Sequence, residues 1–296
     1  MATHAESRAQ DQHQEHWRSY VAMFRAAMQA WSAHRASSMG ASLAFYASFS
    51  LAPMFVIVIA IAGMVFGEDA TRGEVVEQLN GLVGTSGAQA VQGLIEGASD
   101  VSQGFLASLA AIAALLLAAT KAFAELKDSL DIIWGNERKK PTSNVITLLR
   151  GRLLSFGLIL TLAFLLLVSL VISALLAAMQ KYWGGGFSDV AWVTESINSI
   201  ISFTVVTALF AVIYKWLPDA RIAWRDVVVG AVVTAGLFTL GKFLIGFYIG
   251  KSAIASSFGA AGSLVVILLW IYYSSQIFFV GAEFTRVYAE RRGSRS

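Results

Sequence analysis

The chain has 296 residues and a formal net charge of +3; 56% of its residues are hydrophobic and 14% are charged. The hydrophobic share exceeds the roughly 45–50% of soluble domains, which indicates a membrane protein. The absence of cysteine excludes disulfides, thiolate metal ligands and a cysteine nucleophile. The four histidines all precede the first long apolar segment, and no Walker-type loop or metallohydrolase motif is present. The sequence therefore predicts no enzyme, no cofactor, no metal and no nucleotide hydrolysis of its own.

Residues 1–16 are hydrophilic, lack the apolar core of a signal peptide and are predicted to form a disordered cytoplasmic tail. Six apolar segments follow, each long enough to cross a bilayer core of about 30 Å as a helix. In chain order they are 41–66, 103–123, 153–180, 197–217, 227–248 and 261–282. Because lipid offers no water to an open backbone, these spans must be helical. We expect an all-α fold, a six-transmembrane-helix bundle forming one domain over 17–288, with a basic tail at 289–296.

Lysine and arginine residues are concentrated on one side of this predicted topology. They precede span 1, separate spans 2 and 3, surround the turn between spans 4 and 5, and follow span 6. The opposite loops carry Arg72, Lys181 and Lys251 among a larger number of acidic residues. The positive-inside rule therefore places both termini in the cytoplasm. This topology accounts for the sequence pI of about 9.2, so a nucleic-acid partner is not expected.

Short amphipathic helices are predicted outside the spans. Before span 1, apolar residues recur with helical spacing at Trp17, Tyr20, Val21, Phe24, Met28 and Trp31. This pattern favours an interfacial helix on the cytoplasmic leaflet, or a helix packed on other cytoplasmic segments, and the two interpretations are compatible. The external loop 68–100 has two amphipathic stretches, which form either a lid over the bundle or an inert cap.

Proline and glycine mark positions of bending and close packing. Pro53 inside span 1 predicts a kink, interpreted as a packing bend or as a hinge beside a cavity. Gly246 and Gly250 have the spacing that lets two membrane helices approach closely. Gly259 and Gly262 belong to a short polar link between spans 5 and 6 that is able to dip back into the bundle.

Lys242 is the strongest candidate for a functional residue. It lies inside span 5, six residues before Tyr248, and a lysine at the centre of a span costs about 2.5–3.5 kcal/mol. One interpretation is that its side chain snorkels to the outer interface. The other is that it holds an anionic group, such as a lipid headgroup, with Tyr46 and Tyr248 as neighbouring hydroxyls. At the cytoplasmic end of span 6, Glu283 and Arg286 are three residues apart and are predicted to form an ion pair.

Several ordered motifs resemble the YihY/virulence factor BrkB family of bacterial inner-membrane proteins. They are AFYASFSLAP at 44–53, LKDSLDIIW at 126–134, LP at 217–218, WRD at 224–226, GA at 230–231, GAAGS at 259–263, LWIYY at 269–273 and GAEF at 281–284. The resemblance runs from about Trp31 to Tyr288, with a departure at Ser257 and Phe258, where the family usually has a tyrosine. It implies a six-helix inner-membrane protein, and the family's association with resistance to host killing and with envelope or lipid homeostasis fits a lipid-handling role.

Three functions are compatible with these observations. The first is a transporter or lipid-translocation component with Lys242 facing a cavity that is open to lipid. The second is a non-transporting scaffold that recruits an envelope protein and leaves Lys242 at the lipid interface. The third is a ribonuclease, a label the family once carried, but the chain supplies no catalytic groups for it. We expect membrane lipids as partners, with small-residue faces that also permit a homo-oligomer.

Overall fold

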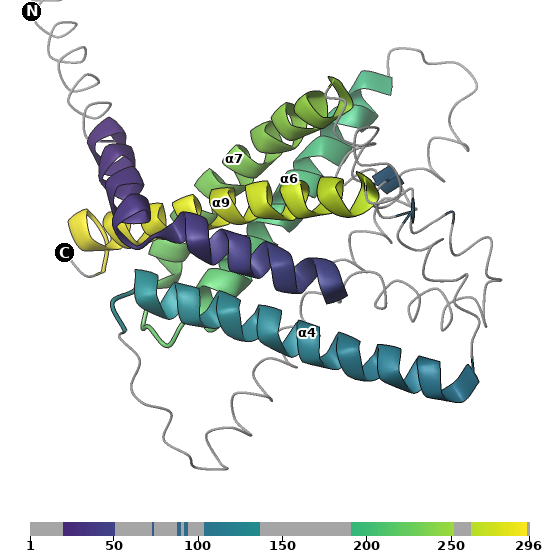
Figure 1. Cartoon of the computed structure of the whole chain (residues 1–296). Coiled ribbons are helices and arrows are strands. Elements are labelled where there is room, and N and C mark those ends of the chain that lie inside the picture. Colours follow the sequence, from purple (N-terminus) through teal and green to yellow (C-terminus); the bar gives the residue numbers. More distant parts are fainter. Residues whose placement is uncertain are drawn as a thin grey trace, which may run out of the picture. The chain divides into compact units, whose positions relative to one another are not determined.

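The computed structural model describes residues 20–50, 73, 88–89, 92–93, 104–136, 191–251 and 262–294 (Figure 1). Every regular element among them is helical, as expected. Several predictions concern residues outside this set and stay predictions. They are the tail 1–16, the second half of span 1 with Pro53, almost all of the external loop, span 3 at 153–180, and Gly259.

The described helices comprise two N-terminal stretches, 20–33 and 36–50, and four longer elements. The latter are α4 (Gly104–Ile133), α6 (Ala191–Trp216), α7 (Trp224–Lys251) and α9 (Gly262–Arg291). Within the described residues, three segments are long and apolar enough to cross a membrane: Ser199–Trp216, Trp224–Tyr248 and Leu264–Arg291. These segments confirm the predicted spans 4, 5 and 6 as helices of membrane-crossing length and composition.

The helix ends follow from local backbone chemistry. The break between 20–33 and 36–50 is a turn at His34 and Arg35, where Arg35 has a φ of 55°. This left-handed conformation costs a non-glycine residue about 1–2 kcal/mol. After α4, Gly135 takes the same region with a φ of 69°, where glycine carries no such cost. The left-handed residue at Arg35 therefore ends the first helix before the second begins at residue 36.

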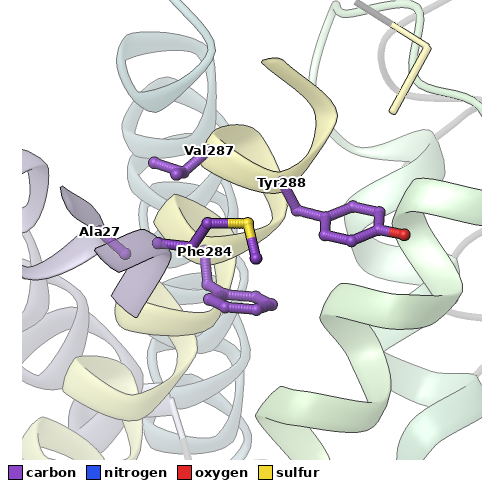
Figure 2. Close-up of a cluster of buried hydrophobic side chains, with 5 residues drawn as sticks. Ala27, Phe284, Val287 and Tyr288 are labelled. Atoms are coloured by element: carbon purple, nitrogen blue, oxygen red, sulfur yellow. The ribbon is translucent and has the colours of Figure 1, made fainter. Parts of the chain in front are cut away.

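The chain groups into two compact units. Unit 1 comprises Met1–Arg35, Leu130–Ala235 and Phe279–Ser296, and unit 2 comprises Ala36–Ser129 and Gly236–Phe278. The core of unit 1 includes a cluster of buried side chains from helix 20–33 and the end of α9 (Figure 2). Its members are Met23, Ala27, Phe284, Val287 and Tyr288. The residues that continue α9 beyond the predicted end of span 6 are therefore held by packing against the N-terminal helix.

Helix 20–33 buries a different face from the aromatic one that the sequence emphasises. Met23 and Ala27 are fully buried, whereas Tyr20, Val21, Phe24 and Met28 remain exposed. The guanidinium of Arg292 lies 5.2 Å from the centre of the Tyr20 ring. The helix therefore packs against the rest of unit 1 through Met23 and Ala27. Its exposed apolar face has the composition of a helix that lies on a membrane surface.

In unit 1, α7 and α9 meet through what we call the Gly-Thr seam, formed by Gly230, Thr234, Gly281 and Thr285. A Cβ atom at Gly230 would lie 1.8 Å from Thr285 Oγ1, and one at Gly281 would lie 2.0 Å from Thr234 Oγ1. Each threonine hydroxyl also donates a 2.7 Å hydrogen bond to the carbonyl oxygen of the glycine four residues earlier in its own helix. Because each glycine accommodates the threonine of the other helix, the two backbones approach closely, as small residues permit in membranes.

In unit 2, the close glycine contacts among the described residues are at Gly40 and Gly241. A Cβ atom at Gly241 would lie 2.3 Å from Ile277 Cδ1, and one at Gly40 would lie 2.1 Å from Gln276 Nε2. At Gly246, by contrast, a Cβ atom would meet no described atom within 4 Å. Helix packing at Gly246 stays a prediction, because spans 1 and 3 lie wholly or partly outside the described residues. Local spacing identifies small residues, but the rotation of the helix decides which of them face a neighbour.

Candidate functional site

The site around Lys242 is built on one side of α7 in unit 2. Gly241 is buried against Tyr273 and Ile277, and Ile245, one turn further, is also buried. Lys242 is half-buried, and its Nζ lies 5.7 Å from the centre of the Phe243 ring. The lysine stem therefore leaves the helix beside the packed face, while its ammonium group contacts an aromatic ring, an interaction that favours a cation.

Two features of α7 lie close to Lys242, a glycine position and an exposed apolar strip. Gly246 lies one turn further along α7, on the side of Lys242, and no described atom would lie within 4 Å of a Cβ atom there. A strip of α7 that is more than half exposed consists of Leu240, Phe243, Leu244, Phe247 and Tyr248. It lies mainly on the face of the helix away from Lys242, and Phe243 is its member next to the lysine. A cation at the edge of an exposed apolar surface matches the chemistry of a phospholipid, which has an anionic phosphate attached to apolar chains.

The grouping of Tyr46 and Tyr248 with Lys242 stays a prediction, and the structure shows where each tyrosine lies on its helix. Tyr248 is exposed and lies six residues further along, so its side chain leaves α7 on a different face. Tyr46 is half-buried in helix 36–50, and its ring packs edge-on against Phe45 with centroids 5.5 Å apart. Gly262 is buried at the first residue of α9. Gly250 lies in α7, but its side-chain surroundings are outside the described part of the chain.

The predicted pair of Glu283 and Arg286 lies within a larger polar cluster in unit 1. Arg286 Nε is 3.2 Å from Glu283 Oε2, and Arg286 Nη1 is 3.2 Å from Glu290 Oε1. The other carboxylate oxygen, Glu283 Oε1, lies 2.5 Å from His34 Nδ1. The side chain of Glu283 is 0% exposed and that of His34 is 28% exposed. Sequence reasoning placed the pair at the cytoplasmic surface and missed His34, which is 249 residues away along the chain.

This cluster has the composition of a structural ion pair. A buried carboxylate is costly unless charged or hydrogen-bonding partners surround it, and here both of its oxygens have a partner. No group of three or more histidine, aspartate or glutamate side chains suited to hold a metal occurs among the described residues. The cluster therefore fixes the break after helix 20–33 to α9, and we assign no chemistry to it.

A third polar cluster, absent from the sequence-based candidates, surrounds the turn between α6 and α7. Lys215 Nζ donates a hydrogen bond to the carbonyl oxygen of Ile222 and lies 5.6 Å from the centre of the Trp224 ring. The rings of Trp216 and Trp224 are 6.0 Å apart and nearly perpendicular. The signal that identifies this cluster in the sequence is a basic residue and two tryptophans at the ends of adjacent spans.

Comparisons with known proteins agree with the motifs in the sequence. The family model for virulence factor BrkB matches residues 27–296. A UPF0761 membrane protein of Verminephrobacter eiseniae is 28% identical over 259 residues, which cover 85% of this chain and 59% of the relative. Relatives of the same name in Psychromonas ingrahamii and Pseudoalteromonas atlantica are 27% and 26% identical, covering 71% and 83% of this chain. The chain spans 59% of the length of the first relative and 68% and 78% of the other two. It spans 37% to 60% of the length of further relatives of this family. No solved structure matches the chain.

Proposed function

The chain belongs to the virulence factor BrkB family and is an integral membrane protein, and on that premise we propose that it is a transporter or lipid-translocation component of the bacterial inner membrane. In this proposal it acts in envelope or lipid homeostasis, keeps both termini in the cytoplasm and hydrolyses no nucleotide. The observation that carries the proposal is the position of Lys242. A cation lies within an apolar span, on the side of Gly246, where no described atom would lie within 4 Å of a Cβ atom, and its ammonium group reaches Phe243 at the edge of the exposed apolar strip.

The physical argument concerns the cost of retaining a lysine at this depth. A charged side chain inside a span is expensive, and such residues commonly mark the path of a substrate or ion. The distance from Lys242 to Tyr248, six helical residues, is about 9 Å at 1.5 Å per residue. That depth brings an ammonium group within reach of a phosphate that has left the outer headgroup layer. The strip from Leu240 to Phe247 then offers a surface on which the acyl chains stay in an apolar environment.

Lipid exchange in proteoliposomes tests this function. Vesicles would carry a headgroup-labelled phosphatidylglycerol, and an impermeant quencher added outside would report the label that reaches the outer leaflet. We expect faster exchange than in empty vesicles. The variant Lys242→Met should exchange lipid about tenfold more slowly, as expected for the loss of one charge-assisted hydrogen bond, and Lys242→Arg should keep most of the rate.

A matched variant controls for general effects of charge. Arg291→Gln removes one positive charge from an exposed residue at the end of α9 and should leave the exchange rate unchanged. Exchange equal to that of empty vesicles would argue for the scaffold interpretation. Equal exchange by the wild type and Lys242→Met would show that lipid crosses without this lysine.

A further inference from the structure

The turn between α6 and α7 presents two tryptophans at the ends of two membrane-crossing segments. The first segment ends at Trp216 and the next begins at Trp224, with residues 217–223 between them. Trp216 is 50% exposed and Trp224 is 48% exposed, although their rings contact each other edge to face. Indole rings are enriched at the level of the lipid headgroups, where one part of the ring is apolar and the N–H remains polar. This turn therefore lies where a span meets the membrane surface.

Lys215 is held at this turn by two contacts. Its ammonium group donates to the Ile222 carbonyl oxygen and lies over the Trp224 ring. Ile222 itself is buried, so the carbonyl belongs to a fixed part of the turn. An ammonium group has three N–H donors, so the geometry positions a cation that can still donate to a further acceptor.

The turn itself is anchored to the rest of unit 1. Asp131 Oδ1 accepts a 2.7 Å hydrogen bond from the backbone N–H of Asp219, and Asn136 Nδ2 donates a 2.7 Å bond to the Asp219 carbonyl oxygen. Leu217 and Pro218, the first two residues of the turn, are buried. A turn held in this way can present its side chains in a defined arrangement, which lowers the entropic cost of binding.

The charges around the tryptophans favour an anionic ligand. Arg221 and Arg225 are exposed on either side of Trp224, in addition to the half-buried Lys215. Three acidic residues lie near the tryptophans in the sequence or are hydrogen-bonded to the turn, namely Asp131, Asp219 and Asp226. Asp226 is buried and accepts bonds from the backbone N–H and hydroxyl of Ser294, at 3.0 and 2.7 Å. Asp131 is bound to the backbone of Asp219, and Asp219 is the acid that remains exposed.

We propose that Lys215, Arg221 and Arg225, together with the rings of Trp216 and Trp224, form a binding site for the headgroup phosphate of an anionic phospholipid in the cytoplasmic leaflet. Lys215 and the arginines would donate to the phosphate oxygens, and the indoles would contact the glycerol and the first methylene groups of the chains. The site does not depend on lipid translocation, because it requires only that the lipid resides beside the turn.

Selective quenching of tryptophan fluorescence tests the site in the full-length protein. The protein would be reconstituted in phosphatidylcholine bilayers containing a small fraction of either phosphatidylglycerol or phosphatidylcholine with brominated acyl chains. The chain has eight tryptophans, so the signal of the pair is the difference between the wild type and Trp216→Phe/Trp224→Phe. We expect brominated phosphatidylglycerol to quench this pair several-fold more strongly than brominated phosphatidylcholine.

Two variants decide whether the preference comes from the site or from general charge. Each basic residue near a membrane surface contributes about fivefold to the binding of anionic lipid, so Lys215→Gln/Arg225→Gln should abolish the preference. Arg291→Gln should retain it, and Lys215→Arg should retain it if folding is intact. Equal quenching by the two lipids in the wild type would overturn the proposal. So would a preference that survives the double variant, or one that Arg291→Gln removes equally well.

Discussion

Glu283 and Gln276 are two polar side chains on α9 with buried polar atoms, and their surroundings differ. Both carboxylate oxygens of Glu283, in unit 1, have partners in His34 and Arg286. Both amide atoms of Gln276, in unit 2, are buried beside Gly40 without a hydrogen-bond partner in the described structure. Buried polar groups are normally satisfied, and exceptions tend to occur where a structure gives up stability for another purpose. At these two positions of α9, unit 1 satisfies a buried polar side chain and unit 2, which also holds Lys242, does not, although the buried indole N–H of Trp31 in unit 1 also has no hydrogen-bond acceptor among the described residues.

The largest effect should come from breaking the Glu283 cluster. His34→Leu leaves a carboxylate that is 0% exposed with Arg286 as its remaining contact. Removing one partner of a buried pair costs about 3–5 kcal/mol, so we expect a loss of that order in the free energy of unfolding. The measurement is unfolding of the purified protein in mixed micelles by titration with SDS, followed by circular dichroism.

The double variant His34→Leu/Glu283→Leu sharpens this prediction. Replacing both partners by apolar side chains leaves no buried carboxylate, so most of the lost stability should return. A double variant as unstable as His34→Leu would show that the contact contributes through packing and not through charge, and the contrast with Gln276 would then disappear.

The next largest effect should come from filling the Gly-Thr seam. In Gly281→Ala the new methyl group would lie 2.0 Å from Thr234 Oγ1 and 2.7 Å from Tyr214 Oη, so the helices must separate. Overpacking of this kind costs about 1–3 kcal/mol. The matched control is Gly246→Ala, where no described atom would lie within 4 Å of the new methyl group and the higher helix propensity of alanine should raise stability by up to about 1 kcal/mol. Comparable losses in the two variants would contradict the assignment of the seam.

A smaller effect is expected from the hydroxyl contact that accompanies the seam. Tyr214 Oη and Thr234 Oγ1 are 3.1 Å apart, and both side chains are fully buried. Thr234→Val keeps the shape of the side chain but leaves the phenol without this partner, which should cost about 1 kcal/mol. The midpoint of thermal unfolding in detergent measures the change, and Thr204→Val, an exposed threonine of α6, serves as the control. An unchanged midpoint in Thr234→Val would mean that the phenol finds another acceptor.

The sequence predicts those helices whose formation depends on a local pattern of apolar residues. Spans 4, 5 and 6 appear as α6, α7 and α9 with similar limits, because membrane-crossing helices require long apolar runs. The extension of α9 to Arg291 was not predicted, since it depends on Phe284 and Tyr288 packing against Met23 and Ala27. The contact between His34 and Glu283 joins residues far apart in the chain, and no local spacing reports it. Likewise, glycine spacing points to Gly246 and Gly250 and not to Gly241, whose close contact with Ile277 depends on the orientation of α7.

The smallest change in stability should come from Gln276→Met, which replaces the amide by an apolar side chain of similar shape. Removing an unsatisfied buried polar group is close to neutral or stabilising, so we expect an unfolding free energy within about 1 kcal/mol of the wild type or above it. The informative measurement is lipid exchange in the same preparation. If unit 2 gives up stability for function, the variant should be at least as stable and exchange lipid more slowly, because the amide is then a group that substrate or water meets during transport. If the variant is as stable and as active as the wild type, the amide of Gln276 has no role in transport and only fills space beside Gly40. Lys242 would then be the one feature of unit 2 in this comparison that is connected with transport.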